Sequence, residues 1–102
     1  MSDSRGRIIG HYASMPDGYR DWWAPVLDSM AAPALDALPH SGAPERWLDL
    51  ASGTGIAARR LLKKLPTGSL VIAGDLVASM LERAREASPR IPVVRLDAAR
   101  LP

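Results

Sequence analysis

One segment, Trp47-Leu48-Asp49-Leu50-Ala51-Ser52-Gly53-Thr54-Gly55, carries the strongest signal in this chain. A short apolar run ends in an acid, and a glycine-rich turn then opens a helical pattern. Gly53 and Gly55 lack Cβ atoms, so the backbone can turn sharply there and come close to a ligand. The free N–H groups at the start of the following helix point into the same turn. The segment therefore predicts a strand–turn–helix unit of a parallel α/β sheet, which binds ligands at the carboxyl ends of its strands.

The acid at Asp49 limits which ligand fits this turn. Residues 53–58 also match the GxGxxA form of the dinucleotide fingerprint. A pyrophosphate over the turn would meet the Asp49 carboxylate about one turn away, and like charges repel in a half-buried crevice. An ammonium or sulfonium would instead be attracted. The pattern thus favours a positively charged adenosine compound over a diphosphate.

Two further apolar runs end in acids. Residues 69–75 predict a second strand that ends at Asp75, which follows Gly53 by about twenty residues, the spacing expected for an acid that binds a ribose. A carboxylate can accept hydrogen bonds from both ribose hydroxyls. Residues 92–98 predict a third strand with Asp97 at its exit. Three acids in this order are more specific than a GxGxxA match alone.

These matches resemble the class I S-adenosylmethionine-dependent methyltransferases, most of all the ubiquinone/menaquinone-biosynthesis type, over residues 47–102. Ala51 stands where the family has its first glycine, a mild variation as long as its φ stays negative. In the family, the acid matching Asp97 binds near the adenine amino group. The resemblance implies S-adenosyl-L-methionine as the cofactor and identifies no catalytic side chain and no metal site. It assigns cofactor binding to Asp49, Ala51, Ser52, Gly53, Thr54, Gly55, Asp75, Leu76, Asp97 and Ala98.

The implied reaction is methyl transfer to a small-molecule acceptor. Two alternatives stay open at this point. The same GxGxxA pattern is compatible with a fragment of an NAD(P)-binding Rossmann oxidoreductase. The chain is also compatible with a non-catalytic half-domain that pairs with a partner chain. Met80 fits a core position on its helix better than an adenine contact.

The chain divides into two predicted regions. Residues 1–44 form an N-terminal lead-in and helical segment, with residues 1–15 loose and a helix over 17–38 that Pro25 and Pro33 split or kink. Residues 45–102 form the N-terminal half of a Rossmann-like domain that binds S-adenosylmethionine. Its expected strands are 46–51, 70–74 and 92–98, and its expected helices are 55–65 and 77–88.

This alternation predicts a parallel sheet in the order 3-2-1 with flanking helices and right-handed crossovers. Because members of the family are much longer than 102 residues, an incomplete class I methyltransferase fold is expected. The first strand would then have an exposed edge through which the chain self-associates.

Composition narrows the remaining classes. The chain has 102 residues, 47% of them hydrophobic, which suits one small domain. No apolar run reaches the roughly 18 residues of a membrane span, and the polar N-terminus is not a secretory signal. A net charge of +2, with charges interspersed, argues against nucleic acid binding. The absence of cysteine excludes a disulfide scaffold and thiolate metal sites and fits a cytoplasmic protein.

Overall fold

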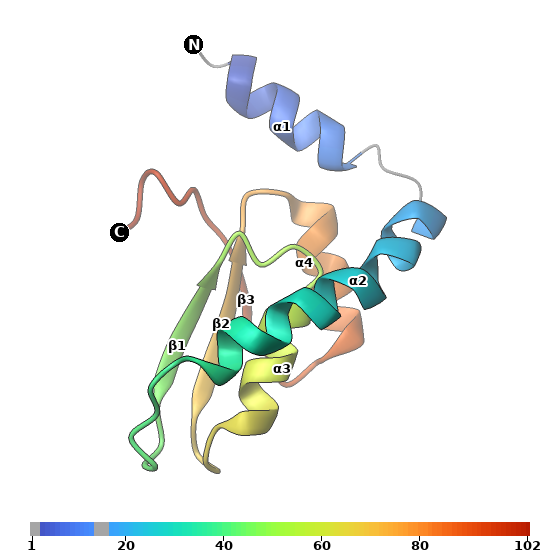
Figure 1. Cartoon of the computed structure of the whole chain (residues 1–102). Coiled ribbons are helices and arrows are strands. Elements are labelled where there is room, and N and C mark those ends of the chain that lie inside the picture. Colours follow the sequence, from blue (N-terminus) through green and yellow to red (C-terminus); the bar gives the residue numbers. More distant parts are fainter. Residues whose placement is uncertain (1–2, 14–16) are drawn as a thin grey trace.

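The computed structural model of this chain describes residues 3–13 and 17–102. From the first strand onward, strands and helices alternate, as Figure 1 shows. The elements are, in chain order, α1 (Asp3–Ala13), α2 (Asp17–Asp36), β1 (Arg46–Leu50), α3 (Ile56–Lys64), β2 (Leu70–Asp75), α4 (Ala78–Ala87) and β3 (Val93–Arg95).

The three strands form one parallel sheet in the order β1-β2-β3, with β2 in the middle. β1 pairs with β2 from Arg46 opposite Leu70 to Leu50 opposite Gly74. β2 pairs with β3 from Ala73 opposite Val93 to Asp75 opposite Arg95. All three carboxyl ends therefore lie at one edge of the sheet, where parallel α/β sheets bind their ligands.

One face of the sheet carries the core. Val71 and Ala73 of β2 are 2% and 0% exposed. Since partners in register point to the same side, Trp47 and Asp49 of β1 share this face with them. Helices α2 and α3 cover it in Figure 1. The buried cluster consists of Leu35, Ala58, Leu61, Leu65, Val71, Ala73 and Ile91.

The opposite face remains open to solvent. Leu48 is 46% exposed, Leu50 38%, Leu70 39% and Val94 40%, although all four side chains are apolar. The register places them on one side of the sheet, because Leu50 and Val94 both lie beside Gly74. We call these four residues the uncovered face.

The N-terminal region differs from the sequence expectation. Asp3–Ala13 is a helix rather than a loose lead-in. Tertiary contacts explain the difference, because α1 packs against α4 and Arg5 forms an ion pair with Asp97. Local propensity alone does not reveal such contacts.

Helix α2 runs as one helix from Asp17 to Asp36 and includes Pro25 and Pro33. The expected alternative of two separate pieces is therefore wrong. A bidentate pair between Arg60 of α3 and Asp28 holds the middle of α2, with N···O distances of 2.8 and 3.0 Å. The buried Leu35 anchors its end in the core. These contacts offset the hydrogen bonds that the prolines remove.

None of the described helices is long and apolar enough to cross a membrane. Within residues 3–13 and 17–102, no group of three or more acidic, histidine or cysteine side chains is placed to hold a metal ion.

Candidate functional site

The glycine turn after β1 is fastened to the end of β2. The backbone N–H of Ser52 donates to the carbonyl of Gly74 at 3.0 Å. The backbone N–H of Gly53 donates to Asp75 Oδ2 at 2.7 Å. Both Gly53 and Gly55 have positive φ, +57° and +83°, a backbone conformation that glycine adopts without strain. The turn predicted from the sequence is thus a left-handed bend that touches the neighbouring strand end.

Alanine at position 51 would be a mild replacement of glycine only if its φ were negative. Its φ is +57°, not negative. The chain leaves β1 through a left-handed residue, and at such a position Cβ approaches the following carbonyl oxygen. This conformation costs an L-residue roughly 1–2 kcal/mol. Alanine in place of the first glycine is therefore a strained substitution, not a mild one.

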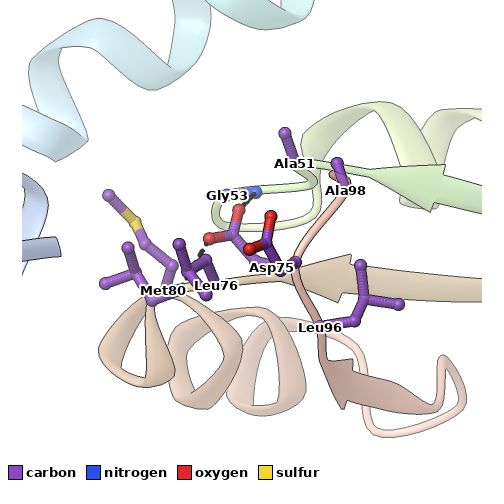
Figure 2. Close-up of a pocket in the computed structure, with 9 residues that line it drawn as sticks. Ala51, Gly53, Asp75, Leu76, Met80, Leu96 and Ala98 are labelled. Carbon is purple, nitrogen blue, oxygen red and sulfur yellow. Dashed lines mark hydrogen bonds between the residues drawn. The ribbon is translucent and has the colours of Figure 1, made fainter. Parts of the chain in front are cut away.

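A cavity of about 280 Å³ opens beside this turn at the carboxyl ends of β2 and β3 (Figure 2). Of the ten residues that the sequence singled out, six line it: Ala51, Gly53, Asp75, Leu76, Asp97 and Ala98. The remaining four, Asp49, Ser52, Thr54 and Gly55, lie in or next to the turn without lining the cavity. The structure therefore brings the turn and two of the three acids to one opening.

Three apolar residues complete the cavity wall, namely Val77, Met80 and Leu96. Met80 is 7% exposed, so it is a core residue and a cavity residue at once. Leu96 packs over Gly74, where an added Cβ would come within 3.0 Å of its side chain. A glycine inside a strand indicates such a close approach, so Gly74 was a signal for this packing in the sequence. Val77 gave no comparable signal.

Asp75 is held by two main-chain donors. Its Oδ2 accepts the N–H of Gly53 at 2.7 Å, and its Oδ1 accepts the N–H of Val77 at 2.9 Å. These bonds fix the carboxylate at the cavity wall. Each carboxylate oxygen has a further lone pair with which to accept a hydroxyl from a ligand.

Asp97 is engaged from two sides. Its Oδ1 accepts the N–H of Ala99 at 3.0 Å. Its Oδ2, which is buried, lies 2.9 Å from Arg5 Nη2 of α1 as an ion pair but accepts no hydrogen bond within the described part of the chain. The sequence alone assigns no role to Arg5, because residues 1–15 are expected to be loose.

Asp49 and Ser52 carry polar atoms that lack hydrogen-bond partners. Asp49 Oδ2 and Ser52 Oγ are both buried, and neither has a partner within the part of the chain that the structure describes. Burial raises the pKa of Asp49; the Ala58 N–H opposes this shift, and the charge of Asp75 adds to it. Because buried polar atoms without partners are rare in folded proteins, both oxygens are candidates for hydrogen bonds to a ligand.

Thr54 and Gly55 have structural surroundings. The carbonyl of Thr54 accepts Arg59 Nη1 at 2.6 Å. Gly55 is the N-cap of α3, and a Cβ added there would lie 3.2 Å from Ala84 Cβ of α4. Gly55 thus allows the two helices to pack closely.

The arrangement suits a ligand with two kinds of surface. Asp75 and Asp97 supply acceptors for hydroxyl or amino groups, while Leu76, Met80 and Leu96 supply apolar area for a flat ring. Among the residues that the structure describes, the lining includes no serine, cysteine, lysine or histidine.

No protein-family model and no curated protein matches this sequence significantly. Solved structures do match the fold. Phosphoethanolamine N-methyltransferase 1 from Haemonchus contortus, solved with phosphoethanolamine and S-adenosylhomocysteine, matches 97% of this chain at 23% identity with a TM-score of 0.75. A TehB-like SAM-dependent methyltransferase from Corynebacterium glutamicum matches 79% of this chain at 24% identity with a TM-score of 0.59.

A putative S-adenosyl-L-methionine-dependent methyltransferase from Methanococcus maripaludis matches 78% of this chain at 23% identity with a TM-score of 0.59. The matches cover only part of these proteins, namely 22% of the Haemonchus, 44% of the Corynebacterium and 37% of the Methanococcus chain. This chain therefore spans less than half the length of the structures it resembles. Over that part, it has the fold of the class I SAM-dependent methyltransferases.

Proposed function

We propose that this chain is the cofactor-binding part of a SAM-dependent methyltransferase that acts on a small-molecule acceptor. The observation that carries the proposal is the pair of buried, unpartnered oxygens, Asp49 Oδ2 and Ser52 Oγ, next to a cavity lined by Asp75 and Asp97. The fold likeness to methyltransferases supports it, and one of them was solved with S-adenosylhomocysteine bound.

The residues of the cavity divide the work of binding. Asp75 accepts the two ribose hydroxyls, and Asp97 with Ala98 binds the amino side of the adenine. The ring packs against Leu76, Met80 and Leu96, which supply the apolar wall. Asp49, two residues before the cavity residue Ala51, attracts the positively charged end of the cofactor.

S-adenosylmethionine, when bound, supplies a methyl group already activated by the positive charge on sulfur. The protein then has to bind S-adenosylmethionine, orient it and keep water away from the apolar wall. Binding and orientation account for much of the rate enhancement when a group is transferred between bound partners. Acceptor-binding residues and any general base belong to parts of the protein that this cavity does not include.

A nicotinamide dinucleotide is the less suitable ligand. Its pyrophosphate would lie over the turn, and burial already disfavours the ionised form of Asp49, raising its pKa. A second negative group nearby would increase that cost, whereas a cation would reduce it. The electrostatics of this turn therefore favour the sulfonium compound.

Calorimetric titration of the full chain with S-adenosylhomocysteine and with S-adenosylmethionine tests the proposal. Both should bind, and Asp49→Asn should weaken the positively charged S-adenosylmethionine more than the neutral-sulfur product. Asp75→Ala should weaken both at least tenfold, because it removes hydrogen bonds to a charged acceptor. Glu82→Gln on α4 is the matched control for removal of one negative charge outside the cavity. Binding of NADH in preference to S-adenosylhomocysteine by folded protein would contradict the proposal.

A second candidate, a half-domain that pairs with a partner chain, is favoured by one observation. The uncovered face exposes four apolar side chains across the three strands, two of them on the edge strand β1. Parallel sheets are normally buried on both faces, so this face fits association with further polypeptide, including a second copy of the chain. Sedimentation equilibrium of the wild type and of Leu48→Lys checks this candidate: association that the substitution leaves intact counts against it. The two-region division of the chain and a cytoplasmic location remain predictions from the sequence.

A further inference from the structure

A charged contact links helix α1 to the ligand cavity. Arg5 Nη2 lies 2.9 Å from Asp97 Oδ2, and Asp97 lines the cavity. α1 also packs against α4, the helix that contributes Met80 to the same cavity. The N-terminal helix is therefore connected to the binding site by both an ion pair and a packing contact.

Both oxygens of Asp97 contact other groups of the chain without a ligand, although only Oδ1 accepts a hydrogen bond. Oδ1 accepts the N–H of Ala99 at 3.0 Å, and Oδ2 faces Arg5. Oδ2 is buried, so few approach directions remain for another donor. A ligand amino group that donates to Oδ2 must share this oxygen with the guanidinium or displace it.

We propose that Arg5 is an internal competitor for the ligand acceptor Asp97, so that ligand binding and docking of α1 oppose each other. In the ligand-free chain, the ion pair neutralises Asp97 and holds α1 near the cavity. A ligand that donates a hydrogen bond to Asp97 weakens this ion pair and loosens α1. The inference rests on the proposed function, because it takes an adenine amino group as the donor.

The expected effect is modest, because the side chains of Arg5 and Asp97 are 44% and 21% exposed and the ion pair is partly screened by water. Removing the competitor by Arg5→Gln should tighten binding of adenosine ligands by about two- to fivefold. This difference in affinity between Arg5→Gln and the wild type should shrink at high salt. Screening by salt weakens the ion pair in the wild type, whereas the variant has no ion pair.

Comparison of two nucleosides separates this competition from other effects of the substitution. Adenosine carries the 6-amino donor, and purine riboside is the same molecule without it. Arg5→Gln should tighten adenosine and leave purine riboside unchanged, because only the former donates to Asp97. Arg7→Gln on the same helix is the control, since no ion pair is found for Arg7 among the side chains that the structure describes.

Hydrogen exchange of the α1 amides supplies the second measurement. In the full chain without ligand, Arg5→Gln and Asp97→Asn should both speed exchange in α1, and the double variant should add little. S-adenosylhomocysteine should speed exchange of α1 in the wild type.

Weaker binding in Arg5→Gln, or α1 amides that become slower on binding, would overturn the inference while leaving the proposed function intact. If S-adenosylhomocysteine bound neither the wild type nor Arg5→Gln, the proposed function would fail and the inference with it.

Discussion

The two faces of the sheet contain similar apolar side chains and differ in what lies over them. On the covered face, Val71 and Ala73 are 2% and 0% exposed beneath α2 and α3. On the uncovered face, Leu48 and Val94 are 46% and 40% exposed. Helices therefore bury the apolar side chains of one face, whereas those of the other face remain in contact with solvent. Parallel sheets are usually buried on both sides. Stability should therefore depend on one face far more than on the other.

The strongest test of this contrast is a pair of truncations. Val71→Ala should lower the free energy of unfolding by about 2–3 kcal/mol, because it removes buried methyl groups and leaves a cavity. Leu48→Ala, although it removes more atoms, should cost roughly 1 kcal/mol or less, since nearly half of that side chain is already in water. Urea unfolding of both variants measures the difference. Equal losses would mean that the uncovered face is buried in solution.

A second pair of variants compares Gly55, which packs against α4, with Gly53, which lines the cavity. Gly55→Ala should cost about 2 kcal/mol or more, because it combines positive φ with a Cβ at 3.2 Å from Ala84 Cβ. Gly53→Ala should cost about 1 kcal/mol, because its φ is also positive but nothing lies within 4 Å of the new Cβ. Thermal unfolding of the two variants checks the order. A larger loss for Gly53 would show that the turn, rather than the packing of α3 on α4, limits stability.

Asp49 is an acid on the covered face. Its carboxylate should lower the stability of the fold while it strengthens binding of S-adenosylmethionine. Burial raises the pKa of Asp49, so folding favours its protonated form, and stability is lost as pH rises above the ordinary value of 3.8. Asp49→Asn should therefore be more stable than the wild type at neutral pH, and the gain should vanish in acid. Binding of S-adenosylmethionine should weaken in the same variant. A loss of stability at neutral pH would mean that the Ala58 N–H outweighs burial.

Ala51 tests strain that is independent of either face. Ala51→Gly relieves a left-handed alanine but adds freedom to the unfolded chain, so the net gain should be roughly 0.5–1 kcal/mol. Chemical denaturation of this variant measures the gain. Ala98→Gly, at another cavity residue with no positive φ, is the control and should not stabilise.

The smallest expected effect belongs to Glu45, just before β1. The backbone N–H of Ser41, with the indole N–H of Trp47, lowers the pKa of Glu45 to about 2. Its contribution to stability is therefore fully present above the ordinary value of 4.5 and is lost as pH falls toward 2. Glu45→Gln should flatten the stability profile in that window and leave the profile near neutral pH parallel to that of the wild type. An unchanged acid limb would contradict this assignment.

The comparison also shows where sequence reasoning succeeds. The expected strand 46–51 and helix 55–65 correspond to Arg46–Leu50 and Ile56–Lys64, because apolar period and glycine punctuation act locally. The helix over Asp3–Ala13 was not predicted, because its contacts with α4 and Asp97 join residues far apart in the chain.

The cavity was predictable only in part. Asp75 and Asp97 follow from strand-end positions, which the sequence pattern contains. The positive φ of Ala51 and the lining by Leu96 depend on how the loops cross the strand ends, which no local pattern encodes. The cofactor-binding role of each residue stays a prediction until binding is measured.

The bond from Gly53 N–H to Asp75 Oδ2 has a consequence for anyone who redesigns ligand preference. The donor belongs to the main chain, so no side-chain exchange at position 53 other than to proline deletes it, and every replacement at position 75 also changes how the turn is held. An asparagine keeps only one acceptor and turns its NH2 group toward a second main-chain donor, because Gly53 and Val77 donate to different oxygens of Asp75. A glutamate, longer by one methylene, would push the bend outward. New specificity at this strand end should therefore leave the Asp75 carboxylate in place.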